Sequence, residues 1–82
     1  MILVDVAVPS VEKKYDFRLD ENAQIAMVIE EIAEMVSQME QCTIVGNREK
    51  LMLCQYGDPA ILDRHATLQD YGIKSGSRLL LV

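Results

Sequence analysis

Tryptophan is absent from this 82-residue chain, and histidine occurs once, as His65. The two cysteines, Cys42 and Cys54, form neither a C-x-x-C pair nor a cluster with the histidine. Structural zinc sites use four Cys or His ligands at short spacings, so the sequence predicts no metal site. A general base at His65 would need a pocket and an orienting partner, and this residue falls in a predicted loop. We therefore expect neither catalysis nor a bound cofactor.

Long hydrophobic runs and positive charge are also scarce. No segment reaches the roughly 18 consecutive apolar residues that a membrane-spanning helix needs, so we expect no direct membrane insertion. The apolar start, residues 1–4, is followed at once by Asp5 and lacks the basic region and cleavage site of a signal peptide, which favours a cytoplasmic location. Thirteen acidic residues against eight Lys and Arg give a net charge of −5, which disfavours nucleic-acid binding.

Half of the residues are hydrophobic, which argues against disorder. The length predicts one small domain over residues 1–82. We expect Cys42 and Cys54 to be reduced structural thiols, as is usual in the cytosol. A disulfide between them is the open alternative, because the sequence does not give the distance between their Cα atoms.

Two alternating stretches open the chain. Residues 1–8 place Ile2, Val4, Val6 and Val8 at a period of two, and residues 14–19 do the same with Tyr15, Phe17 and Leu19. A turn containing Pro9 separates them, so the pattern predicts a β-hairpin. A helix is then expected over residues 23–39, because seven apolar residues follow helical spacing: Ile25, Val28, Ile29, Ile32, Met35, Val36 and Met39. Asp20 or Asn22 could cap its start.

The second half of the chain predicts shorter elements. Residues 42–45 are expected to be extended, and residues 50–55 alternate weakly, with Leu51 and Leu53 on one face. A turn follows over residues 56–59, then a short edge strand over 60–62, a helical turn over 68–71 that Gly72 closes, and a final strand over 78–82. This order indicates an α+β fold with one main helix on a mixed sheet of four to five strands. The first and last strands are expected to be parallel neighbours at its centre.

One segment carries a family resemblance. Thr67-Leu68-Gln69-Asp70-Tyr71, with Ile73 and then Leu79-Leu80-Leu81, resembles the segment with which ubiquitin-like β-grasp proteins close their sheet. Phe17-Arg18-Leu19-Asp20 and residues 68–79 are most similar to the YukD/EsaB-type proteins encoded with bacterial type VII secretion systems. The resemblance implies a cytosolic accessory or regulatory component of such a system. Its partner would be a membrane component of that machine or a regulator of its expression.

Conjugation or sulfur carriage is the alternative that the resemblance raises. Tailed members of this family use a flexible C-terminal Gly-Gly, whereas this sequence reaches Val82 at the end of a predicted strand. A β-branched side chain would crowd a site shaped for glycine. We therefore expect a non-conjugated protein-interaction module in place of a sulfur carrier or protein modifier.

The sheet face away from the helix is the predicted protein-binding site. Alternation places five apolar residues there: Leu3, Met52, Cys54, Leu80 and Val82. An apolar patch on a small domain often marks a partner site, and the resembled family uses this face for docking. Neighbouring side chains or a homodimer contact could cover it instead. The sequence leaves open whether the protein is a monomer or a weak homodimer.

Overall fold

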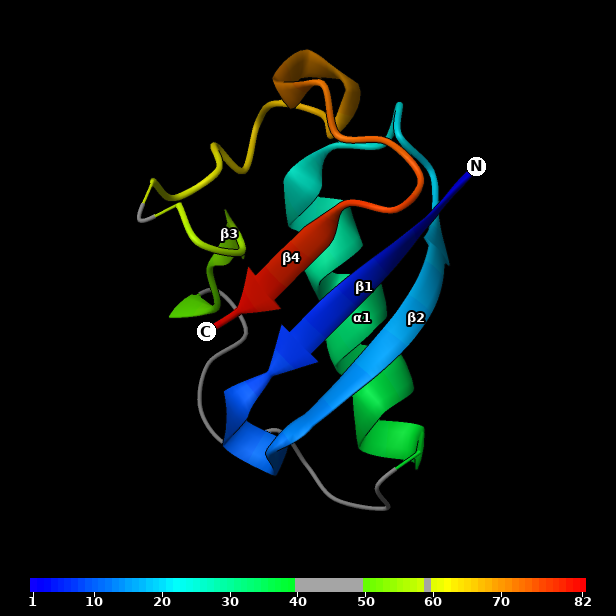
Figure 1. Cartoon of the computed structure of the whole chain (residues 1–82), viewed down its shortest axis with the longest axis vertical. Coiled ribbons are helices and arrows are strands. Elements are labelled where there is room, and N and C mark those ends of the chain that lie inside the picture. Colours follow the sequence, from blue (N-terminus) through cyan, green and yellow to red (C-terminus); the bar gives the residue numbers. More distant parts are fainter. Residues whose placement is uncertain (40–49, 59) are drawn as a thin grey trace.

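The computed structural model describes residues 1–39, 50–58 and 60–82. It contains a four-stranded sheet whose one face is crossed by a single long helix (Figure 1). In chain order, the elements are β1 (Ile2–Val8), the 3-10 helix η1 (Pro9–Val11), β2 (Lys13–Leu19), α1 (Ile25–Met39), β3 (Leu53–Gln55), the 3-10 helix η3 (Gln69–Tyr71) and β4 (Arg78–Leu81).

The sheet has the order β2-β1-β4-β3. β1 pairs antiparallel with β2 and parallel with β4, and β3 pairs antiparallel with β4. The expected mixed sheet, with the first and last strands parallel at its centre, is therefore confirmed. Among the described residues, no helix combines the length and the apolar character needed to cross a membrane.

The core lies between the sheet and α1. Even-numbered residues of β1, such as Val4 and Val6, face the helix and are almost completely buried, as are Phe17 and Leu19 of β2. The helix contributes its apolar stripe to the same core: Ile25, Val28, Ile29, Ile32, Ala33 and Val36. The helical spacing thus predicted the buried face correctly, although Met39, at the end of the stripe, is half exposed.

The start of α1 differs from the prediction. Neither Asp20 nor Asn22 caps it: an Asp20 carboxylate oxygen accepts the backbone N–H of Asn22 at 2.9 Å, in a turn that precedes the helix. The first helical N–H groups instead reach a distant loop. Ile25 donates to the carbonyl of Ala66 at 2.8 Å and Ala26 to that of Arg64 at 3.0 Å. These carbonyls satisfy donors that a helix end leaves free, so tertiary contacts replace a local cap.

The predicted edge strand over residues 60–62 is reduced to one bridge. Ile61 lies opposite Cys54, and the Leu62 N–H donates to the Leu53 carbonyl at 2.9 Å. Cys54 is a buried free thiol. The predicted extended stretch 42–45 and Cys42 lie outside the described residues. The predicted helical turn is confirmed as η3, and Gly72 closes it with a φ of 69°, in the left-handed region that favours glycine.

Candidate docking face

The outer face of the sheet, on the side away from α1, is built from rows of side chains that run across the strands. Directly paired residues project to the same side of a sheet, so the strand register decides which side chains are neighbours. On β1, the odd-numbered residues face outward: Leu3 is exposed, and Asp5 and Ala7 are half-buried. Asp5 and Ala7 each belong to a different row that runs across the sheet.

The apolar row lies toward the C-terminal end of β1. Ala7 is paired with Leu80 of β4, Leu80 with Cys54 of β3, and Cys54 with Ile61. At its other end, Ala7 lies opposite Lys14 of β2. Met52 and Val82 extend the apolar surface beside this row, since the N–H of each donates to the carbonyl of the other, at 2.7 and 2.9 Å.

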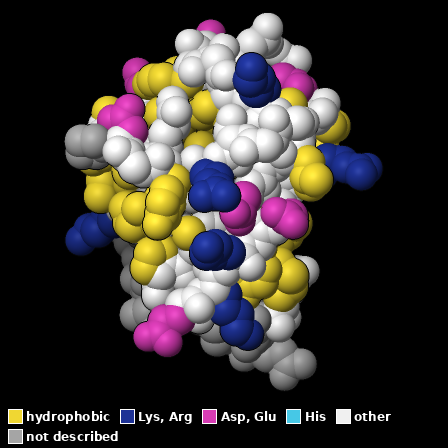
Figure 2. Space-filling model, viewed as in Figure 1, with side chains coloured by type: hydrophobic (Ala, Val, Ile, Leu, Met, Phe, Trp, Pro, Cys, Tyr) yellow, Lys and Arg dark blue, Asp and Glu magenta, His cyan; other side chains and the backbone are white. Residues whose placement is uncertain are grey.

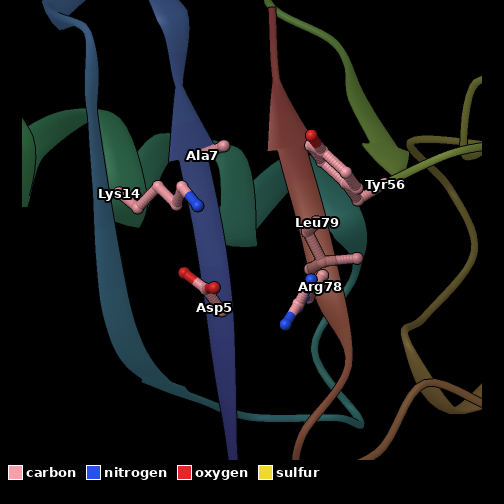
Figure 3. Close-up of a pocket in the computed structure, with 6 residues that line it drawn as sticks. All are labelled: Asp5, Ala7, Lys14, Tyr56, Arg78 and Leu79. Carbon is pink, nitrogen blue, oxygen red and sulfur yellow. The ribbon is translucent and has the colours of Figure 1, made fainter.

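The neighbouring row is charged. Asp5 lies between Asp16 of β2 and Arg78 of β4. Tyr56 closes the row, because its N–H donates to the Arg78 carbonyl at 2.9 Å. Figure 3 shows the Asp5 carboxylate and the Lys14 amine beside β1, and the ring of Tyr56 reaching over β4 toward its C-terminal end, away from Arg78.

A shallow depression lies at the C-terminal end of β1, next to the apolar row. It is lined by Ala7, Val8, Pro9, Glu12, Lys13, Lys14, Tyr56 and Leu80. Figure 2 views this face: hydrophobic side chains gather on the side of β3 and β4, and charged side chains cross its middle. The depression is therefore lined by apolar residues, the aromatic ring of Tyr56, and charged residues of both signs, Glu12, Lys13 and Lys14.

The structure divides the predicted five-residue site. Met52, Leu80 and Val82 are neighbours, but Leu3 is separated from them by the charged row. Because Asp5 is level with Arg78, Leu3 and Val82 are about six residues or 20 Å apart along the strands. Cys54 is only 7 % exposed, since Ile61 lies beside it, so it offers little surface. The expectation that Leu3 and Cys54 flank one continuous exposed patch is therefore wrong.

Two exposed residues of this face were missed by sequence reasoning. Tyr56, 60 % exposed, continues the alternation of Met52 and Cys54, but its position before Gly57-Asp58-Pro59 assigned it to a turn. Ile61 was assigned to an edge strand without a facing residue. We use the term docking face for the corrected set, which is Ala7, Met52, Tyr56, Ile61, Leu80 and Val82.

The titratable and metal-ligating side chains considered from the sequence form no second site in the described residues. Over residues 1–39, 50–58 and 60–82, no three Cys, His, Asp or Glu side chains are placed to hold a metal ion. The backbone N–H of His65 is bonded to an Asp63 carboxylate oxygen at 2.9 Å, within the loop that contacts the helix start. The Met1 ammonium group donates to Glu21 at 2.9 Å, which lowers the pKa of that carboxyl.

Comparison with known proteins gives a family and a fold. Residues 3–81 match the model of the family described as WXG100 protein secretion system (Wss), protein YukD. No curated protein is similar enough to be matched.

Several solved ubiquitin-like structures superpose on almost the whole chain. The N-terminal ubiquitin-like domain of the 4931431F19Rik protein is 28% identical, with a TM-score of 0.72 over 99% of this chain and 72% of its own. The ubiquitin-like domain of Arabidopsis thaliana protein At2g32350 is 22% identical, with a TM-score of 0.72 over 99% and 74%. Caldiarchaeum subterraneum ubiquitin is 16% identical, with a TM-score of 0.69 over 98% and 89%.

Proposed function

The chain belongs to the YukD family of the WXG100 protein secretion system, and we propose that it serves this system as a ubiquitin-like docking module. It would act in the cytoplasm as an accessory or regulatory component, without being conjugated to other proteins and without catalysing a reaction. Its partner would be the cytosolic part of a membrane component of the secretion system. The docking face would be the surface that binds.

The observation that carries this proposal is the apolar half of the outer sheet face. Met52 is 39 % exposed and Tyr56 is 60 % exposed, and both adjoin half-buried Leu80. A cluster of large apolar side chains on the water-facing side of a small domain is a common mark of a protein-binding site. Aromatic residues and methionine are also enriched in the centres of protein interfaces.

The size and charge of the docking face indicate what it would bind. Burial of about 300–400 Å² of apolar surface gives about 8–10 kcal/mol before association costs are subtracted, a scale compatible with micromolar binding. Lys14 and Arg78 stand beside the apolar row, on the face of a chain that is acidic overall. A segment that carries apolar side chains flanked by a carboxylate would fit both features.

A titration with a matched pair of variants tests the proposal. The isotope-labelled protein is mixed with purified cytosolic domains of the membrane components of the same secretion system, and amide shifts are followed by NMR. Met52→Glu places a charge in the apolar half of the docking face and should weaken binding about tenfold or more. Met27→Glu makes the same change at a residue of α1 that is 65 % exposed, and it should leave binding unchanged.

Both variants should keep the melting temperature of the parent protein, because both methionines are already exposed. Equal loss of binding in the two variants, or shifts that map to α1, would argue against the docking face.

Intact-mass measurement after incubation with ATP and an activating enzyme tests the alternative that the protein is a sulfur carrier or protein modifier. We expect no added mass at Val82, whose backbone is held to Met52 by hydrogen bonds of 2.7 and 2.9 Å.

A further inference from the structure

A second surface lies at the edge of the sheet formed by β2. Among the described residues, this strand pairs with β1 alone, so one side of its seven-residue backbone is open. An open edge presents N–H and C=O groups that can pair with another strand. The edge is separate from the apolar half of the docking face, which lies over β3 and β4.

The hydrogen bonds of β1 show which backbone groups point outward from β2. The Asp5 N–H donates to the Ser77 carbonyl at 3.0 Å, and the Leu3 carbonyl accepts the Gly76 N–H at 2.9 Å. Odd-numbered residues of β1 therefore direct their backbone groups toward the β4 side. Because these groups alternate in direction along a strand, the even-numbered residues of β1 bond to β2. Their partners are Lys13, Tyr15, Phe17 and Leu19.

It follows that Lys14, Asp16 and Arg18 direct their backbone N–H and C=O groups away from β1, to the open edge. Their side chains all lie on the outer face of the sheet and are exposed. Charged side chains commonly protect an edge from unwanted pairing. Here, however, the signs alternate as plus, minus, plus, so their effect depends on the register of an incoming strand.

Asp16 is the residue of this edge whose charge is least balanced by its neighbours. It lies directly opposite Asp5, a like-charged pair that is unfavourable across strands. Asp5 has Arg78 on its other side, whereas no strand in the described part of the chain lies on the other side of Asp16. Within the described residues, neither carboxylate takes part in an ion pair. A cation placed across the open edge would complete the row.

We propose that this edge binds a second copy of the chain, β2 against β2 and antiparallel, with the two-fold axis at Phe17. Asp16 of each copy would then lie opposite Arg18 of the other, and these residues would exchange backbone hydrogen bonds through the groups that point outward. Lys14 would lie opposite Asp20. Every charged pair across the edge has opposite signs in this register.

Three other antiparallel registers also pair residues whose backbone groups point outward, with the axis at Asp16, Arg18 or Tyr15. Each of them is disfavoured. An axis at Asp16 sets the two Asp16 carboxylates against each other and each Lys14 against Arg18. An axis at Arg18 opposes two Arg18 guanidinium groups and sets Asp16 against Asp20. An axis at Tyr15 pairs Lys14 with Asp16 but brings Lys13 against Phe17, and its pairing ends at Glu12, whose φ of 56° is not extended. The charges therefore exclude the axes at Asp16 and Arg18, and the Lys13–Phe17 contact and the turn at Glu12 disfavour the axis at Tyr15, which leaves the axis at Phe17.

This arrangement would join two sheets into one continuous layer. A two-fold axis normal to the sheet keeps both α1 helices on one face and both docking faces on the other, so dimerisation leaves the apolar half of each docking face free (Figure 1). A strand edge alone buries less than the roughly 1,000 Å² expected of a stable interface, so we expect self-association only at high protein concentration.

Charge reversal tests the register directly. Sedimentation velocity between about 10 µM and 1 mM protein should show a monomer–dimer equilibrium in the parent. Asp16→Arg and Arg18→Asp should each weaken it about tenfold or more, because each sets like charges against each other twice. The double variant Asp16→Arg/Arg18→Asp should restore the dimer at unchanged net charge. An equimolar mixture of the two single variants should form a heterodimer, although neither associates with itself.

Amide exchange in the same samples locates the contact. The N–H groups of Asp16 and Arg18 should become protected as the concentration rises, while that of Phe17 should not change. Met52→Glu should leave self-association intact, which separates this proposal from the docking face. A parent that stays monomeric at 1 mM, a dimer that survives Asp16→Arg, or a double variant without rescue would overturn it.

Discussion

Asp5 of β1 lies directly opposite Asp16 of β2, in a cross-strand pair of two carboxylates on the outer face of the sheet. Arg78 of β4 lies on the other side of Asp5. The row therefore alternates between repulsion at one side of β1 and attraction at the other. This charged row separates Leu3 from the apolar residues of the docking face, and within the described residues it leaves Asp16, at the β2 edge, with a carboxylate and no cation directly opposite.

Relief of the repulsion should stabilise the monomer. Asp16→Asn removes one charge of the pair and keeps the shape of the side chain, so we expect the free energy of unfolding to rise by about 0.5 kcal/mol at low ionic strength. Asp16→Glu keeps the charge and should bring no gain. Urea denaturation at low micromolar protein measures both, and the gain should fade in 1 M salt, where screening is strong. A gain that persists in 1 M salt would point to another cause.

Removal of the positive charge at Arg78, on the other side of Asp5, should instead lower the stability of the monomer. Arg78→Glu would place three carboxylates side by side across β2, β1 and β4, and we expect a loss of about 1 kcal/mol of stability at low salt. Arg78→Lys keeps the charge and should cost much less. If both variants unfolded at the same urea concentration, the contribution of Arg78 would lie in its packing and not in its charge.

Periodicity predicted most of the fold. The alternation in residues 1–8 and 14–19 and the stripe from Ile25 to Val36 are strong local signals, and they correspond to β1, β2 and α1. The helix start was mispredicted because Ala66 and Arg64 provide its partners from a loop some forty residues later in the chain. A local pattern such as Asp20-Glu21-Asn22 carries no information about such a contact.

The neighbours of each residue on the docking face are likewise not predictable from local sequence patterns. Alternation correctly assigned Met52, Leu80 and Val82 to the outer face, but it does not fix which residues of different strands are neighbours. That depends on the register between β1 and β4, which puts Leu3 and Val82 at opposite ends of the sheet. The burial of Cys54 likewise depends on its bridge to Ile61, a long-range pairing that alternation within one strand does not predict.

The helix start leads to a prediction about Asn22. Within the described residues, its side chain makes no hydrogen bond to the helix, so Asn22→Ala should lower the free energy of unfolding by less than about 0.5 kcal/mol. Leu68→Ala provides the contrast. Leu68 is fully buried beside the same loop, and its truncation should cost about 2–5 kcal/mol by leaving a cavity. An Asn22→Ala loss near 1–2 kcal/mol in urea denaturation would instead indicate a true capping residue.

Substitution of Gly72 should show the cost of a left-handed backbone conformation alone, because an added side chain meets no neighbouring atom. Its φ is 69°, and a Cβ atom added there would meet no atom within 4 Å. Gly72→Ala should therefore cost only the left-handed conformation of an L-residue, about 1 kcal/mol in the free energy of unfolding. Gly72→Asn should cost less, because asparagine tolerates this region better. A urea titration of the two variants checks the order. If the asparagine variant proved the less stable, size and not conformation would govern the position, and the left-handed closure of η3 would be in error.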